Sequence, residues 1–80
     1  MTKEEIYTSL DEVFQDVFDD DTIHVNAETT ADDIEEWDSL EHINLVVAVE
    51  KKFGVKFTMG EVTGMKNVGE MVDIILERQK

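Results

Sequence analysis

Cysteine and proline are absent from this 80-residue sequence, and glycine occurs four times. Without cysteine the chain has no disulfide framework and no thiolate metal ligands, which fits a reducing compartment such as the cytoplasm. No apolar run approaches the roughly 20 residues that a membrane-spanning helix needs. The first ten residues, MTKEEIYTSL, lack the basic start and the apolar block of a signal peptide. We therefore expect a cytoplasmic protein without a membrane segment.

Basic residues are also scarce. Seven lysines and arginines stand against 20 aspartates and glutamates, which gives a formal net charge of −13. Such a charge repels phosphate backbones and anionic lipid surfaces, so nucleic acids and membranes are poor partners and basic proteins are favoured. Residues 1–36 contain 13 acidic residues and one basic residue. The acidity therefore belongs to the first half of the chain.

Four capping residues are each followed three positions later by glutamate, as in the capping box of a helix start. The pairs are Thr2 with Glu5, Asp38 with Glu41, Thr58 with Glu61, and Asn67 with Glu70. Apolar residues at helical spacing predict a helix over 3–18, a second from Asp38 to a stop at Gly54, and a last one from about residue 68. Gly60 and Gly64 weaken the third start, so we expect one or two turns there.

The length favours one domain over residues 1–80, with a small core. The segment VKF at 55–57 looks like a strand but has no comparable strand to pair with, so an all-α bundle is predicted. Residues 19–37 form an unusually long connection, which its apolar residues can pin over the bundle. Those residues are Ile23, Val25, Ile34 and Trp37. The apolar stripe expected on the second helix is Leu40, Ile43, Val46, Val47, Val49 and Phe53, and the expected core aromatics are Phe14, Phe18, Phe53 and Phe57.

Ser39 stands where the second helix begins. If Asp38 is the N-cap, Ser39 is the first helical residue and its hydroxyl is not needed for capping. The backbone donors and the positive dipole end of a helix start favour an anion, so a phosphate ester on Ser39 would lie in a favourable field. From these residues alone, an ordinary helix-start serine is the simpler interpretation and a modified serine is the alternative.

The segments DSLEHINLVVAVEKKFGVKF and MKNVGEMVDII, with unbroken spacing between them, resemble the acyl carrier protein family over nearly the whole chain. The resemblance implies a four-helix acyl-carrier-like bundle, with three longer helices, one short helix and a long loop between the first two. It also implies that Ser39 receives 4′-phosphopantetheine from coenzyme A through a separate phosphopantetheinyl transferase. The thiol of that arm would hold acyl intermediates of fatty acid, polyketide, lipid or other specialised biosynthesis as thioesters.

The resemblance further implies a monomeric carrier that performs no catalysis itself. Its partners would be acyl-loading and acyl-using enzymes with basic docking surfaces. We expect them to recognise Asp38, Leu40, Glu41 and His42, with His42 exposed near the arm. Glu36 and Trp37 depart from the pattern of fatty-acid-synthesis carriers, and His42 and two lysines dilute the acidity of the second helix. These departures favour a free-standing carrier outside core fatty acid synthesis.

Several alternatives remain or can be set aside. A Ser39–His42 nucleophile pair lacks the Gly-x-Ser-x-Gly elbow and a pocket, so no enzyme activity is predicted. A calcium loop that starts at Asp19 fails the EF-hand spacing, so no metal site is predicted. Three methionines, Met59, Met65 and Met71, are either core filling or, with Ile43 and Val47, the lining of a cleft for an acyl chain. An aminoacyl or peptidyl carrier, and an acidic domain that binds a basic protein through residues 4–36, remain open.

Overall fold

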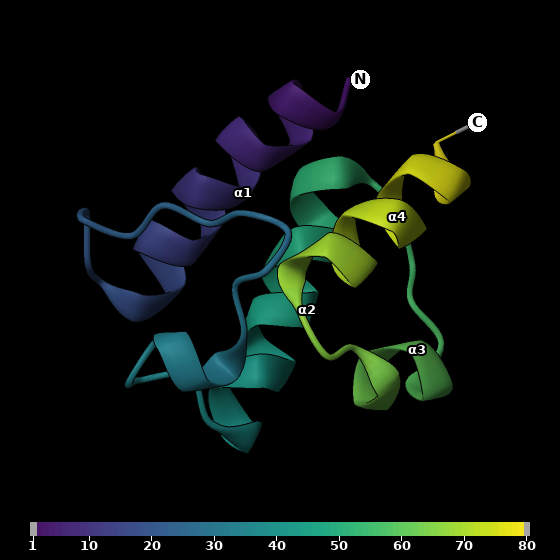
Figure 1. Cartoon of the computed structure of the whole chain (residues 1–80). Helices are drawn as coiled ribbons and strands as arrows, with labels where there is room; N and C mark the ends of the chain where they lie inside the picture. The colour runs from purple at the N-terminus through teal and green to yellow at the C-terminus, as the bar shows by residue number, and fades with distance from the viewer. Residues whose placement is uncertain (1, 80) are drawn as a thin grey trace.

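The computed structural model describes residues 2–79, in which four α-helices pack as a bundle (Figure 1). The elements are α1 (Lys3–Phe18), the 3₁₀ helix η1 (Ala31–Asp33), α2 (Ser39–Phe53), α3 (Met59–Gly64) and α4 (Val68–Arg78). No strand is present in this part of the chain, and VKF lies in the connection between α2 and α3. The predicted all-α fold, with three longer helices and one short one, is confirmed. Residues 1 and 80 of the expected domain lie outside the described residues.

All four predicted helix starts are confirmed, but they are built in two ways. Thr2 with Glu5 and Thr58 with Glu61 form complete capping boxes, in which each side chain accepts from the other residue's backbone N–H. At α2 and α4 the N-cap side chain alone accepts, from Glu41 N at 2.8 Å and from Glu70 N at 2.9 Å. The Glu70 carboxylate instead accepts from the backbone N–H of Lys66. These two starts are therefore simple N-caps.

The core lies where α1, α2 and α4 face one another. The fully buried side chains of these helices are Ile6, Leu10, Phe14, Leu45, Val49, Val68, Met71, Val72 and Ile75. Leu45 is missing from the stripe predicted for α2, whereas Leu40, Ile43 and Val47 of that stripe are exposed. Apolar residues surround much of α2, so spacing along the sequence could not tell which face meets α1. Phe53 and Phe57 are partly buried at the edge of the core.

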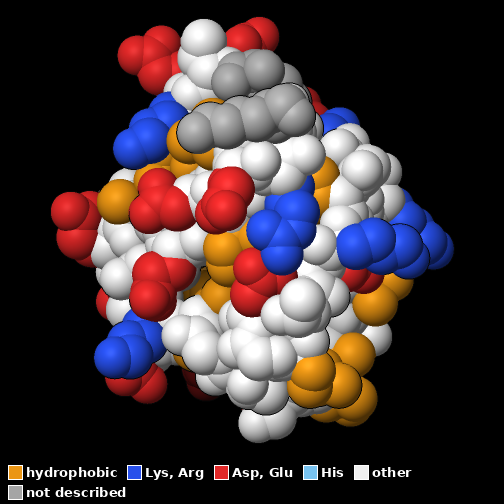
Figure 2. Space-filling model, turned by 90° about the vertical axis from the view of Figure 1, so that its right-hand side faces the viewer, with side chains coloured by type: hydrophobic (Ala, Val, Ile, Leu, Met, Phe, Trp, Pro, Cys, Tyr) orange, Lys and Arg blue, Asp and Glu red, His pale blue; other side chains and the backbone are white. Residues whose placement is uncertain are grey.

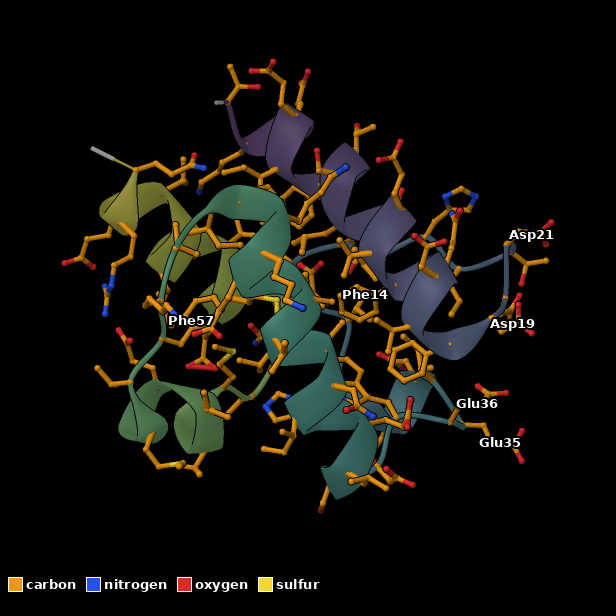
Figure 3. The ribbon with its side chains drawn as sticks, turned by 180° about the vertical axis from the view of Figure 1, so that it is seen from behind. Phe14, Asp19, Asp21, Glu35, Glu36 and Phe57 are labelled. Atoms are coloured by element: carbon orange, nitrogen blue, oxygen red, sulfur yellow. The ribbon has the colours of Figure 1, made fainter. Side chains whose placement is uncertain are left out.

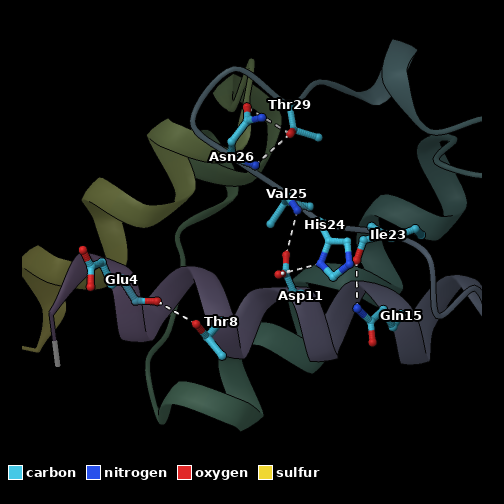
Figure 4. Close-up of polar contacts among 9 residues, drawn as sticks. All are labelled: Glu4, Thr8, Asp11, Gln15, Ile23, His24, Val25, Asn26 and Thr29. Carbon is cyan, nitrogen blue, oxygen red and sulfur yellow. Dashed lines mark hydrogen bonds and ion pairs between the residues drawn. The ribbon is translucent and has the colours of Figure 1, made fainter.

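The long connection between α1 and α2 is fixed at both sides. Asp11 accepts a hydrogen bond from the backbone N–H of Val25 at 2.7 Å, and the side-chain amide of Gln15 donates to the carbonyl of Ile23 at 2.8 Å (Figure 4). Val25, Ile34 and Trp37 are buried, and Ile23 packs against the core, as predicted. The sequence did not predict η1 within this connection.

The same connection reaches α4 through backbone hydrogen bonds. The N–H of Val68 donates to the carbonyl of Thr29 at 2.9 Å, and the N–H of Gly69 donates to that of Ala27 at 3.0 Å. A Cβ atom on Gly69 would lie 2.9 Å from the Ala27 oxygen, so this close approach requires glycine. The connection therefore holds the start of α2 in a fixed place relative to α1 and α4.

Charge follows the uneven distribution in the sequence. Asp19, Asp21, Glu35 and Glu36 lie around the connection and point away from the bundle, whereas Phe14 points into it (Figure 3). On the face in Figure 2, which is the right-hand side of Figure 1, basic and acidic side chains are interspersed. The strongly negative surface thus lies toward the first half of the chain.

Candidate functional site

Ser39 is the first residue of α2 and is exposed. Asp38 performs the capping beside it. The Asp38 side chain accepts from Glu41 N at 2.8 Å, and its carbonyl accepts from His42 N at 2.8 Å. The helix therefore begins without using the Ser39 hydroxyl as its cap, as the sequence predicts.

An open cavity of about 480 Å³ lies beside Ser39, between α2, α3 and the start of α4. Its α2 wall includes Ser39, His42 and Ile43. Met65 and Met71 line the cavity, as one interpretation of the methionines proposed. Other lining residues are Ala31, Trp37, Asp38, Val62, Thr63, Lys66 and Asn67. The space beside the serine is therefore largely apolar, with one lysine and one aspartate at its border.

Two members of the predicted cleft lie elsewhere. Met59 is 74% exposed at the first position of α3, and Val47 is 43% exposed on α2. Neither lines the cavity. Leu40 and Ile43 are 70% and 50% exposed. With Val47 they stand three and four positions apart, so the three side chains share one outward face of α2 that begins next to Ser39.

Trp37 covers the base of this site. It is buried, and its ring meets Phe14 edge to face with centroids 5.2 Å apart. Its indole N–H donates to Nδ1 of His42 at 3.1 Å, and the two rings stack with centroids 5.9 Å apart. The prediction that Trp37 is a lid residue just before Ser39 agrees with this burial.

His42 was expected to be exposed, and this expectation is wrong. The side chain is half-buried, because its second ring nitrogen, Nε2, lies 2.9 Å from the carbonyl oxygen of Val62 in α3. Since Nδ1 accepts from the indole, the proton of a neutral ring must be on Nε2, which then donates to Val62. The spacing in the sequence placed His42 near Ser39, but it could not show the contact with a helix 20 positions away.

A second contact holds α3 from the side of α4. Arg78 Nη2 donates to the two carboxylate oxygens of Glu61 at 2.6 and 2.7 Å. The backbone N–H of Thr58 also donates to Glu61. The hydrogen bond from Thr58 lowers the pKa of Glu61 below its usual range, and Arg78 adds to the shift. Glu61 is therefore ionised at neutral pH and ties the start of α3 to the end of α4.

Within residues 2–79, no three or more histidine, aspartate or glutamate side chains are grouped so that they could hold a metal ion. None of the helices there is both long and apolar enough to cross a membrane.

Comparison with known proteins assigns the class. A family model described as the phosphopantetheine attachment site matches residues 8–75. The chain belongs to this family, whose covalent cofactor is 4′-phosphopantetheine. The matched residues include all those that line the cavity, and all of α2 and α3.

The individual relatives are acyl carrier proteins. That of Acidothermus cellulolyticus is 41% identical over 75 residues, which cover 94% of this chain and 89% of the relative. The acyl carrier protein of Myxococcus xanthus is 38% identical over 92% of this chain and 94% of its own length. The solution structure of a holo acyl carrier protein from Geobacter metallireducens matches with a TM-score of 0.85 and 42% identity, over 91% of this chain and 84% of that one.

The residues around Ser39 fit such a cofactor. The hydroxyl is exposed, and the cap is supplied by Asp38. The first amides of α2 and its positive dipole end favour a phosphate at this position. The adjoining cavity offers apolar walls from Ile43, Met65 and Met71. The residues at this site therefore fit both the phosphate of a phosphopantetheine arm and an apolar group attached to the arm.

Proposed function

We propose that the chain is an acyl carrier protein and that Ser39 is its attachment site. The observation that carries the proposal is an exposed serine at the first position of a helix whose cap is another residue, at the mouth of an apolar cavity. When bound through a phosphodiester to the serine oxygen, 4′-phosphopantetheine supplies the thiol that this cysteine-free chain lacks, for an acyl thioester.

The chain's own residues position the attachment serine and shelter the acyl group. Asp38 fixes the first turn of α2, so the backbone at Ser39 keeps one position relative to the bundle. Ile43, Met65 and Met71 offer an apolar wall that excludes water from the part of an acyl chain nearest the protein. Bonds to the acyl group are made and broken by partner enzymes, and the carrier itself is not a catalyst.

Partner enzymes would dock on the α2 surface next to Ser39. We assign recognition to Asp38, Leu40 and Glu41, and extend it along the outward face to Ile43 and Val47. Exposed aliphatic side chains in one contiguous row support this assignment, since such patches mark interaction sites. The acidic residues beside them favour basic docking surfaces on a phosphopantetheinyl transferase and on acyl-handling enzymes. The carrier would act as a monomer in the cytoplasm.

The test is intact-protein mass spectrometry after incubation with coenzyme A and a broad-specificity phosphopantetheinyl transferase. Wild type should gain the mass of one phosphopantetheine. The chain contains one other serine, Ser9 in α1, which provides a matched control. We expect Ser9→Ala to be modified like wild type and Ser39→Ala to remain unmodified. Modification of Ser39→Ala, or none of a folded wild type, would refute the assignment.

The group carried in the native host then decides between the remaining alternatives. A fatty acyl or polyketide thioester on the isolated protein supports the acyl carrier, and the group's structure tests whether the pathway lies outside core fatty acid synthesis. An aminoacyl thioester would make the chain an aminoacyl carrier instead. If a folded chain is never modified, the acidic surface of residues 4–36 and a basic protein partner become the leading explanation.

A further inference from the structure

His42 lies where three segments meet next to Ser39. It accepts a hydrogen bond from the indole of Trp37, which precedes α2, and it donates one to the carbonyl of Val62 in α3. Both contacts are partly buried. A single imidazole on the first turn of α2 thus joins the end of the long connection to the short helix.

The short helix needs such contacts. α3 has six residues, of which Val62 is buried. Helices of this length do not persist in water by their own hydrogen bonds, so tertiary contacts must keep α3 in place. His42 holds it on the side of α2, and the Glu61–Arg78 ion pair holds it on the side of α4. Because Val62 and Ser39 line the same cavity, the position of α3 sets how far that cavity opens.

We propose that His42 is a positioning residue, which holds α3 and Trp37 against the Ser39 end of α2. By holding α3 there, His42 keeps the cavity beside the attachment serine from opening further. This replaces the expectation that His42 contacts partner enzymes directly. The role of this positioning in the protein's activity rests on the proposed carrier function. The contacts of His42 do not depend on that function, so the test is made on unmodified protein.

Substitutions can separate the two hydrogen bonds. The amide of asparagine reaches about as far as Nδ1 of histidine, and the amide of glutamine about as far as Nε2. His42→Asn should therefore keep the acceptor for Trp37 and lose the donor to Val62, whereas His42→Gln should do the reverse. His42→Phe retains an aromatic ring beside Trp37 and removes both hydrogen bonds. The matched control is His24→Gln, since His24 is an exposed histidine on the long connection.

Two signals report the two contacts by nitrogen–proton NMR. The indole N–H resonance of Trp37 reports the first, and hydrogen exchange of the Val62 amide, which donates to Thr58 within α3, reports the second. Loss of one neutral hydrogen bond should speed exchange in α3 about fivefold. We expect this increase in the Asn and Phe variants, and a shifted indole resonance in the Gln and Phe variants. His24→Gln should show neither change.

Cavity opening is measured by the rate at which peroxide oxidises the methionines, followed by peptide mass spectrometry. Met71 is 1% exposed at the cavity wall, whereas Met59 is 74% exposed, which makes Met59 an internal reference. His42→Phe should speed oxidation of Met71 several-fold and leave that of Met59 unchanged. His42→Asn should speed it as well, since α3 is released in both.

The outcomes that overturn the proposal are distinct from a failure of the carrier function. Wild-type exchange of Val62 and wild-type oxidation of Met71 in His42→Phe would refute it. So would an equal increase of exchange at the core amides of α1, because that indicates general destabilisation. If His42→Phe does not fold, identical behaviour of the Asn and Gln variants would refute the division into two contacts. Failure of Ser39 modification would refute the carrier assignment and leave these results intact.

Discussion

The division of labour between Asp38 and Ser39 gives the sharpest prediction. Asp38 Oδ1 accepts from Glu41 N at 2.8 Å, which satisfies one of the unpaired donors at the start of α2. Replacing an N-cap aspartate by alanine costs about 0.5–2 kcal/mol of the free energy of unfolding. A small domain loses about 4–8 °C in Tm per kcal/mol, so Asp38→Ala should melt several degrees below wild type.

Ser39→Ala should differ little from wild type. Its side chain is exposed and does not supply the cap, and alanine is a good helix former, so the change in unfolding free energy should be within about 0.5 kcal/mol. Asp38→Asn is the informative companion. Asparagine caps about as well as aspartate but carries no charge, so its stability should match wild type. If the transferase recognises the charge, modification of Ser39 will slow in Asp38→Asn without any loss of Tm.

The assay is thermal unfolding by circular dichroism for all three variants, with modification rates measured by mass spectrometry. The reasoning is refuted if Ser39→Ala destabilises as much as Asp38→Ala, since the serine hydroxyl would then be part of the cap. It is also refuted if Asp38→Ala melts with wild type.

Two further predictions concern the contacts that position the site. Gly69→Ala places a Cβ atom 2.9 Å from the Ala27 oxygen and should lower the free energy of unfolding by about 1–3 kcal/mol, measured by chemical denaturation. The control is Gly60→Ala in α3, whose Cβ would meet nothing within 4 Å and which should be neutral or stabilising. Equal effects of the two substitutions would contradict the close approach at Gly69. The pKa of Glu61 is lowered in the folded state from its ordinary value of 4.5, so the stabilising contribution of this group is present above that value and is lost as pH falls through the lower folded pKa. The protection factors of the α3 amides, which correct for the intrinsic dependence of exchange on pH, should therefore fall in wild type as the pH drops through the folded pKa of Glu61. The difference in protection from Glu61→Gln should shrink there, and a difference that grows on acidification would reverse the sign of the argument.

The balance of charges on α2 gives the docking face proposed for it a mixed character. Its two glutamates already accept hydrogen bonds from this chain, Glu41 from the side chain of Asn44 and Glu50 from the backbone N–H of Phe57. Lys51 and Lys52 lie in the last turn of the helix, and Lys52 forms an ion pair with Glu12 of α1. The exposed aliphatic side chains of Leu40, Ile43 and Val47 are thus a main feature of the proposed docking surface. Acidic contacts would come mainly from Asp38, Glu41 and the connection before them.

The features that could be predicted from the sequence are those decided by interactions between residues close together in the chain. Capping residues, helical spacing and glycine stops act within a few positions, so all four helix starts and the stop at Gly54, with φ of 66°, were predicted correctly. The same locality placed Ser39 directly after its cap, at the first position of α2, where the structure shows it exposed. The absence of cysteine and the excess of acid restricted the chemistry and the partners before any fold was known.

Tertiary structure decided the contacts between residues that are far apart in the chain. It selected Leu45 for the core and turned Leu40, Ile43 and Val47 outward, because the position of α1 determines which apolar face of α2 is covered. It placed His42 between Trp37 and Val62, because the connection and α3 converge on the first turn of α2. The sequence by itself thus determined where each helix begins and which serine is available, whereas the packing of separate segments created the cavity beside that serine and the histidine that borders it.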